Sequence, residues 1–263
     1  MNKVSNIFIL LLVVIFVGFA QDNRKGCTLS DYITTFSEDQ VLKNKTGWAF
    51  WFIPSKGVAD TLSVKMSCVD KMLGTHDPHA HFEDELFLMV KGTAIVHLNG
   101  EEQKISEGTS FYAPGNSSHS IRRIDENAPI WYVMFKRETP GGLKVPFLPG
   151  IKEYSMKDCI VPFSEAALTR EDNERTMWYL KKEMSTGGLS TRLHIPTDTS
   201  MHQAEISPIQ EVYFVLEGTA KVTVNGKSRV ITALSSCYCP PNSTHSIQKE
   251  GDKTLKYLVV RTK

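Results

Sequence analysis

The sequence predicts an all-β protein made of two tandem modules, each a double-sheet jelly roll or small barrel. The chain repeats itself: "ELFLMVKGTAIVHLNG" (85–100) aligns without a gap with "EVYFVLEGTAKVTVNG" (211–226). The same offset places "PGNSSHSI" (114–121) on "PPNSTHSI" (240–247). A repeat that keeps one register over such a span indicates two copies of one structural unit.

Within each copy, short runs of β-branched and aromatic residues predict strands, as in "LFLMV", "AIVHL", "SFYA", "SIRRI" and "IWYVMF". "NG" at 99–100 and at 225–226 is a strong signal for a hairpin, because a type I′ turn needs two residues with positive φ. Residues 164–184 are expected to lead into the first strands of the second copy, with a short helix as the alternative. Many short strands separated by turns are typical of jelly rolls and small barrels.

The N-terminus predicts a signal peptide over residues 1–20. A short region with one lysine precedes the apolar run "IFILLLVVIFVGFA", which ends in small residues. That run is shorter than the roughly 20 residues that span a bilayer. Cleavage after Ala20 would export the protein to the periplasm or the extracellular space. Retention in the ER lumen and an uncleaved membrane anchor are the alternatives.

The remaining chain is expected to form an N-terminal domain over 21–140 and a C-terminal domain over 141–263, joined near the Pro- and Gly-rich segment 138–150. The 30 basic and 29 acidic side chains nearly balance. This balance gives no reason to expect a nucleic-acid partner or an anionic membrane surface, and we expect no stable membrane insertion after cleavage. The five cysteines include no C-x-x-C pair, so mostly buried thiols are expected.

The first module contains a candidate metal site. His79 and His81 alternate along a predicted strand, so their imidazoles face the same way. Glu85 follows after a short turn, and His119 lies beyond a hairpin on a strand that can return beside them. Three imidazoles and one carboxylate suit a divalent transition metal such as Mn, Fe, Zn, Ni or Cu. Solvated or core histidines are the alternative, but four candidates in a repeated β frame favour the metal. One carboxylate offsets only part of the ion's charge, which favours an anionic or enolisable ligand.

Other side chains are candidates for catalysis in the first module. His76, whose repeat mate is His202, can serve as acid or base, and Glu85 can also accept a proton. Strand parity places Arg123 on the same face as His119, where its guanidinium can clamp a carboxylate. A surface position for Arg123 and an exposed His76 are the alternatives.

In the second module the candidate site is altered. Glu205 and Ser207 replace the first two histidines, whereas Glu211 and His245 persist. Glu205, Glu211 and His245 form a candidate second site for a harder metal. The alternative is a vestigial site whose barrel is kept for packing.

The spacing of these residues carries a family resemblance. One set is Gly74, four residues, His79-Ala80-His81, three residues, Glu85, six residues and Gly92; the other is Gly108, five residues, Pro114, four residues and His119. They resemble the two motifs of the cupin superfamily, and the repeat resembles a bicupin over about 60–137 and 185–260. The first set has a leading spacer one residue shorter than usual. Asn116 stands where glycine is common, and asparagine tolerates positive φ.

The resemblance implies two tandem double-stranded β-helix barrels and a metal-dependent enzyme acting on a small polar organic acid or sugar-derived substrate. Isomerase, lyase and hydrolase chemistry by Lewis-acid activation remain open. A non-catalytic, small-molecule or sugar-binding bicupin is the alternative from another class. The second module also resembles the (S)-ureidoglycine aminohydrolases, although here the complete ligand set lies in the first module. Oxalate decarboxylases are also bicupins, but they have two full sites in a longer chain, whereas this chain is short and has one degenerate site. The resemblance also implies that such chains can pair into homo-oligomers.

Overall fold

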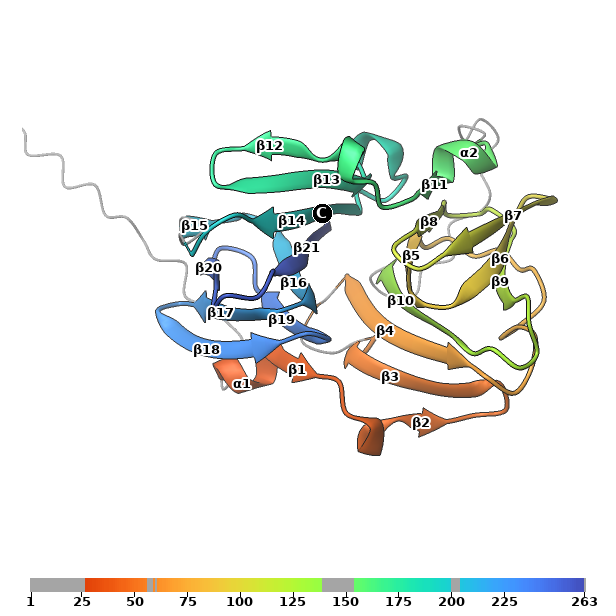
Figure 1. The fold of residues 1–263 in the computed structure, drawn as a ribbon, viewed down its shortest axis with the longest axis horizontal. Coiled ribbons are helices and arrows are strands. Elements are labelled where there is room, and N and C mark those ends of the chain that lie inside the picture. Colours follow the sequence, from red (N-terminus) through yellow and green to blue (C-terminus); the bar gives the residue numbers. More distant parts are fainter. Residues whose placement is uncertain (1–26, 56–58, 60, 139–153, 200–203, 263) are drawn as a thin grey trace, which may run out of the picture.

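The computed structural model describes residues 27–55, 59, 61–138, 154–199 and 204–262. The predicted signal peptide, most of the linker and His202 lie outside these residues. The described part of the chain consists mainly of strands, which confirms the all-β class (Figure 1). The first half contains α1 (Leu29–Tyr32), β1 (Ile33–Thr35), β2 (Leu42–Lys43), β3 (Gly47–Ile53), β4 (Leu62–Val69), β5 (Glu85–Lys91), β6 (Thr93–Leu98), β7 (Glu101–Ser106), β8 (Ser110–Ala113), β9 (His119–Arg123) and β10 (Ile130–Arg137). The second half contains α2 (Met156–Cys159), β11 (Ile160–Val161), β12 (Thr169–Glu171), β13 (Glu174–Leu180), β14 (Ser190–Pro196), β15 (Glu205–Ile206), β16 (Gln210–Glu217), β17 (Thr219–Val224), β18 (Lys227–Thr232), β19 (Ser235–Cys239), β20 (Thr244–Lys249) and β21 (Lys256–Thr262).

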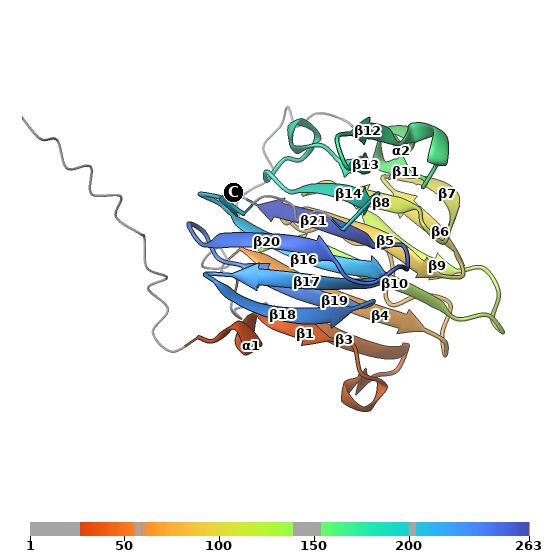
Figure 2. The same cartoon turned by 60° about the vertical axis from the view of Figure 1, so that its left-hand side comes forward.

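Each module pairs a large sheet with a smaller one. In the N-terminal module, the seven-stranded sheet β11-β8-β5-β10-β4-β3-β2 is combined with the three-stranded sheet β7-β6-β9. In the C-terminal module, the seven-stranded sheet β1-β19-β16-β21-β14-β13-β12 is combined with the four-stranded sheet β15-β20-β17-β18 (Figures 1 and 2). The modules thus have matching architecture, as the repeat predicts.

The two halves exchange strands. β1 pairs with β19 of the C-terminal module, and β11 pairs with β8 of the N-terminal module. Figure 1 shows the accompanying helices in the same reciprocal places, with α1 beside the strands of the C-terminal module and α2 beside those of the N-terminal one. Each large sheet therefore ends in a strand from the other half, and this exchange covers a sheet edge that would otherwise be open.

The large sheets also pack on each other through aromatic side chains. The ring of Phe214 lies 4.9 Å from that of Phe52 and 5.7 Å from that of Phe135, centroid to centroid, in edge-on contacts. Phe135 and Phe214 are fully buried. This packing explains why the strand "EVYFVL" is apolar along its length rather than alternating. Its side chains face either the barrel interior or the other module, and both faces are buried.

The predicted hairpins are present. Asn99 and Gly100 have φ values of 49° and 94°, and Asn225 and Gly226 have values of 49° and 75°. These positive values are the ones that a type I′ turn requires. Residues 164–184 lead into the strands β12 and β13, as expected, with only short 3₁₀ turns beside them.

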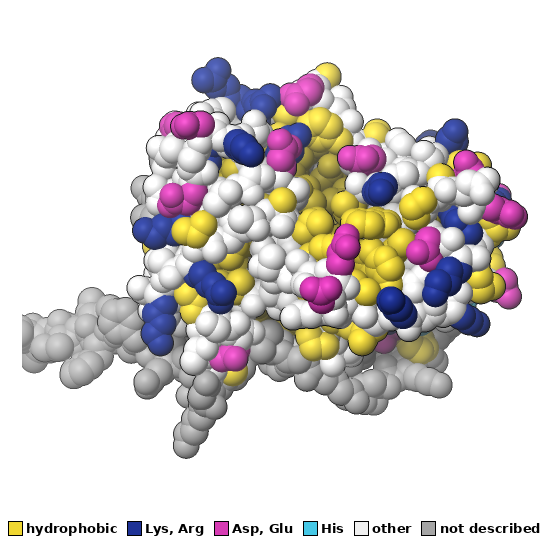
Figure 3. All heavy atoms as spheres, turned by 60° about the horizontal axis from the view of Figure 1, so that its bottom comes forward, with side chains coloured by type: hydrophobic (Ala, Val, Ile, Leu, Met, Phe, Trp, Pro, Cys, Tyr) yellow, Lys and Arg dark blue, Asp and Glu magenta, His cyan; other side chains and the backbone are white. Residues whose placement is uncertain are grey.

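On the face seen in Figure 3, basic and acidic side chains are interspersed, and neither kind forms a continuous patch. No helix among the described residues is long and apolar enough to cross a membrane. None of the five cysteines forms a disulfide, and four of the thiols are buried, in agreement with the expectation of buried thiols.

Candidate metal centre

The predicted ligands of the first module converge. His79 forms an antiparallel bridge with His119, the first residue of β9, through N–H···O distances of 3.2 and 2.9 Å. Glu85 is the first residue of β5, which brings its carboxylate to the same end of the barrel. One ring nitrogen from each of His79, His81 and His119 lies within 4.8 Å of the other two. The chain thus gathers four candidate ligands that lie as far as 40 residues apart in sequence.

A tight turn fixes His81 against the strand of His119. The backbone N–H of Asn116 donates to the carbonyl of His81 at 2.5 Å, and Asn116 has a φ of 66°. A Cβ on Gly115 would lie 2.2 Å from the carbonyl oxygen of Phe82, which is closer than real contacts allow. Glycine at position 115 therefore permits the approach that holds the two ligand segments together.

The hydrogen bonds of His119 show that the site suits a cation. Its Nδ1 lies 2.8 Å from the carbonyl of Ser117, and because a carbonyl only accepts, this nitrogen carries the proton. In the neutral imidazole, Nε2 then presents a lone pair to Glu85 Oε2 at 3.2 Å. On the other side of the carboxylate, His81 Nε2 lies 3.3 Å from Oε1. Two acceptor atoms that face each other need a proton or a cation between them. This set of nitrogen and oxygen ligands therefore fits a divalent metal.

The pKa values of the site point the same way. Burial opposes ionisation of Glu85, but the interactions of its carboxylate with the imidazoles of His119 and His81 outweigh burial and lower the pKa of Glu85. Burial and the neighbouring histidines His76, His119 and His81 lower the pKa of His79, against the attraction of Glu85. At neutral pH the site therefore offers a carboxylate and an unprotonated His79 imidazole, which are the forms that bind metals.

Two lysines complete the site, and the sequence reasoning missed both. Lys136 lies opposite Glu85 in the pairing of β10 with β5, and its Nζ is 3.6 Å from Glu85 Oε1. Lys65 lies on the neighbouring strand β4; burial lowers its pKa, the charge of Glu85 raises it and that of Lys136 lowers it. A signal was available in the repeat, because arginines occupy the corresponding strand positions of the second module, Arg261 and Arg192.

The other two predicted catalytic residues lie in different settings. The ring of His76 is exposed and meets the ring of His79 edge-on, with centroids 4.1 Å apart. Arg123 is buried, and its guanidinium donates to the carbonyls of Met72 at 2.7 Å and Glu126 at 2.6 Å. These bonds tie two loops together and occupy two of the arginine's donor groups. The use of Arg123 as a carboxylate clamp stays a prediction.

The residues of the candidate second site also lie close together, but here the guanidinium of an arginine contacts the two acids. One atom from each of Glu205, Glu211 and His245 lies within 4.8 Å of the others. The guanidinium of Arg261 reaches both carboxylates, with Nη2 3.0 Å from Glu205 Oε1 and Nε 3.0 Å from Glu211 Oε1. His245 repeats the arrangement of the first site, since its Nδ1 lies 3.0 Å from the carbonyl of Ser243.

Comparison with known proteins finds a match to one family model and matches to solved structures. The family model of the cupin domain matches residues 71–135 and 192–261. Among solved structures, a point mutant of oxalate decarboxylase from Bacillus subtilis has a TM-score of 0.68 at 18% identity, covering 90% of this chain and 78% of that one. A formate complex of oxalate decarboxylase from Lactobacillus farciminis has a TM-score of 0.69 at 16% identity, covering 90% of this chain and 87% of that one. At these identities the structural matches show a shared fold. A comparison with curated protein sequences finds no match.

Proposed function

The chain belongs to the cupin domain family and carries two copies of the domain, and from this we propose that it is a metal-dependent enzyme acting on a small organic acid. The observation that carries the proposal is the convergence of three histidines and Glu85 in the first module, beside two lysines. The second copy lacks this set of histidines. We therefore assign catalysis to the N-terminal module.

The proposed roles follow from the positions of the side chains. His79, His81, His119 and Glu85 would hold the metal. A divalent transition metal bound there supplies Lewis acidity, which polarises a substrate oxygen or lowers the pKa of a hydroxyl. His76 lies at the exposed edge of the site, where it can exchange a proton with solvent and substrate. The Ser117 carbonyl fixes the tautomer and orientation of the His119 ring.

The charges around the site support a substrate that carries a carboxylate. Lys136 on β10 and Lys65 on β4 add positive charge beside Glu85. A bound divalent ion would add to this positive charge, so an anion is the ligand that best balances the site. The structurally similar oxalate decarboxylases are named for a dicarboxylate substrate, and one of their solved structures concerns Mn(II) centres. Oxalate, short hydroxy and keto acids and uronates are therefore the first compounds to assay, with Mn²⁺ as the first metal.

Metal removal tests the proposal directly. We expect the purified chain to turn over one of these acids, to lose that activity after treatment with EDTA and to regain it with one particular divalent metal. Elemental analysis of the native protein should identify the same metal. A binding protein of the same fold would hold an acid without consuming it, and turnover that persists in EDTA would contradict the assignment.

Lys136→Met should weaken substrate binding while leaving the metal in place. Lys136 lies on β10, outside the histidine cluster, so its replacement leaves the metal ligands intact. Its Nζ is next to Glu85, so the replacement removes a positive charge beside the proposed substrate site. We expect KM for an anionic substrate to rise about tenfold, as for loss of one charged hydrogen bond. Lys136→Arg, which retains the charge, should recover most of the affinity. Equal KM values for wild type and Lys136→Met would exclude Lys136 from substrate binding.

We infer that the protein is exported, on the basis of the apolar N-terminal segment alone. Protein isolated from its native source should then begin at Gln21. N-terminal sequencing that finds Met1, or any residue within the apolar run, would contradict cleavage after Ala20.

A further inference from the structure

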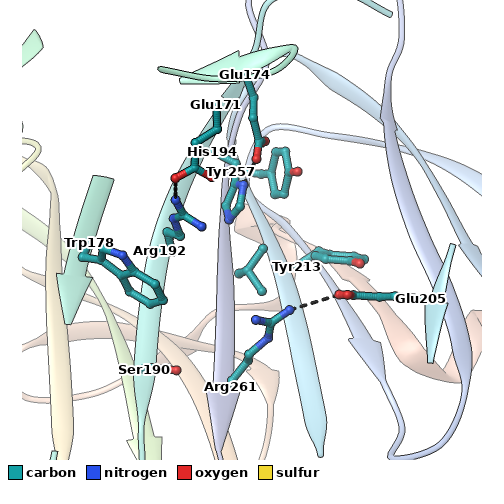
Figure 4. Close-up of a pocket in the computed structure, with 11 residues that line it drawn as sticks. Glu171, Glu174, Trp178, Ser190, Arg192, His194, Glu205, Tyr213, Tyr257 and Arg261 are labelled. Atoms are coloured by element: carbon teal, nitrogen blue, oxygen red, sulfur yellow. Dashed lines mark hydrogen bonds and ion pairs between the residues drawn. The ribbon is translucent and has the colours of Figure 1, made fainter. Parts of the chain in front are cut away.

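The C-terminal module contains a cavity that the proposed function does not use. Its volume is about 230 Å³, and strands β12, β13, β14, β15, β16 and β21 supply its lining residues. Figure 4 shows charged and aromatic side chains of these strands directed toward one another around this space. The cavity has the size of a site for a small molecule rather than for a peptide or a large cofactor.

Three acid–base pairs line the cavity. Arg192 Nη2 donates to a carboxylate oxygen of Glu171, His194 Nδ1 lies 2.9 Å from Glu174 Oε2, and Arg261 Nη2 lies 3.0 Å from Glu205 Oε1. Each basic group in the wall thus faces a carboxylate, and donors and acceptors stand side by side (Figure 4). A ligand that carries a carboxylate would have to compete with these glutamates for the same cations.

At the candidate second site, the guanidinium of Arg261 contacts the two carboxylates that a metal ion would bind. This guanidinium lies 3.0 Å from one oxygen of Glu205 and 3.0 Å from one oxygen of Glu211, so a single positive charge already faces the two carboxylates nearest His245. In the first module the corresponding Lys136 approaches two carboxylates less closely, with its Nζ 3.6 Å from Glu85 Oε1 and 3.9 Å from Glu83 Oε2. A divalent metal in the second module would have to displace the guanidinium or lie against it. The guanidinium of Arg261 therefore competes with a metal for both carboxylates.

Aromatic faces supply the rest of the wall. The indole of Trp178 is 38% exposed at the cavity, and the guanidinium carbon of Arg192 lies 5.0 Å from its ring centroid. The ring of Tyr257 stacks on His194 with centroids 5.1 Å apart, and Tyr213 meets Tyr257 edge-on. Such rings present apolar faces, while the paired charges offer adjacent hydrogen-bond donors and acceptors.

The geometry points to a second, metal-independent binding site in the C-terminal module, for a small neutral polyhydroxylated molecule of monosaccharide size. Vicinal hydroxyl groups can each donate to a glutamate and accept from the neighbouring arginine without breaking the ion pair. The C–H face of a sugar or cyclitol ring can pack on the exposed indole of Trp178. This site is independent of the proposed catalytic centre and needs neither its metal nor its histidines.

Intrinsic fluorescence and calorimetry can test this site, because Trp178 is the tryptophan that lines it. The full chain, kept in EDTA, is titrated with D-glucose, D-galactose, D-mannose and myo-inositol, and in parallel with D-glucuronate. We expect at least one neutral compound to give a saturable change in fluorescence, and the same dissociation constant by calorimetry. Trp178→Phe should lose the fluorescence change but retain calorimetric binding, whereas Trp178→Ala should bind about tenfold more weakly. The His79→Ala variant should bind the compound as the wild type does.

Three results would overturn the inference. The first is the absence of saturable binding by every neutral compound in the panel. The second is tighter binding of D-glucuronate than of any neutral compound, which would mean recognition of a carboxylate. The third is binding of two equivalents of Mn²⁺ by the wild type, with one equivalent lost in Glu205→Gln, which would show a metal at the second site. Because the sugar titrations use metal-free protein, failure of the proposed catalytic function does not affect them.

Discussion

Replacing His79 with alanine is expected to lower the affinity of the protein for its metal by about 100-fold or more. Loss of an outer partner of a ligand already costs roughly 10–100-fold, and His79 is one of three imidazoles that would contact the ion directly. Its side chain is exposed, so the substitution leaves no cavity in the core. Turnover should fall in parallel with metal occupancy.

The measurement is titration of metal-free protein with Mn²⁺ by calorimetry, together with thermal unfolding with and without the ion. A ligand at 100 times its dissociation constant stabilises a folded protein by about 2.7 kcal/mol, and a 100-fold loss of affinity in His79→Ala should reduce this to about 0.4 kcal/mol. His97→Ala is the matched control, because His97 lies on β6 outside the cluster and accepts a hydrogen bond from the Gly100 N–H at 3.2 Å. Equal Mn²⁺ affinity in wild type and His79→Ala would remove the basis for the metal centre.

Replacing Asp84 with alanine is expected to destabilise the protein by about 3–5 kcal/mol. The Asp84 side chain is buried next to Glu85 and joins the two halves of the chain. Its carboxyl group accepts hydrogen bonds from five donors: Tyr112 Oη, Gly115 N, Ser185 Oγ, Thr186 Oγ1 and Gly187 N. Alanine would leave buried donors without an acceptor, and removal of one member of a buried polar group of this kind has a cost of that size.

Urea unfolding followed by far-UV circular dichroism measures this loss. Asp125→Ala provides the comparison, because Asp125 is exposed and its carboxylate accepts one hydrogen bond, from the Asn127 N–H at 2.7 Å. That variant should lie within about 1 kcal/mol of the wild type. If Asp84→Ala unfolds at the same urea concentration as Asp125→Ala, the connection through Asp84 contributes little to stability.

The sequence by itself determined the class of fold and most of the first site. The repeat revealed two equivalent modules, and the NG turns fixed hairpins that the structure contains, because both signals depend on local backbone preferences. The four candidate ligands were found from strand parity and from the repeated spacing. Strand parity is reliable over short distances because successive side chains alternate between the two faces of a sheet.

Only the tertiary structure revealed the contacts that depend on which strands pair and in which register. The exchange of β1 and β11 between modules, the bonds from Ser185–Gly187 to Asp84 and the approach of Lys136 to Glu85 join segments that are distant in sequence. The same holds for Arg261, which faces Glu211 across β21 and β16 and forms ion pairs with Glu211 and Glu205. A pattern of residue types assigns side chains to faces of a strand, but register decides which charge meets which, and in a β protein register is settled by the packing of the whole sheet.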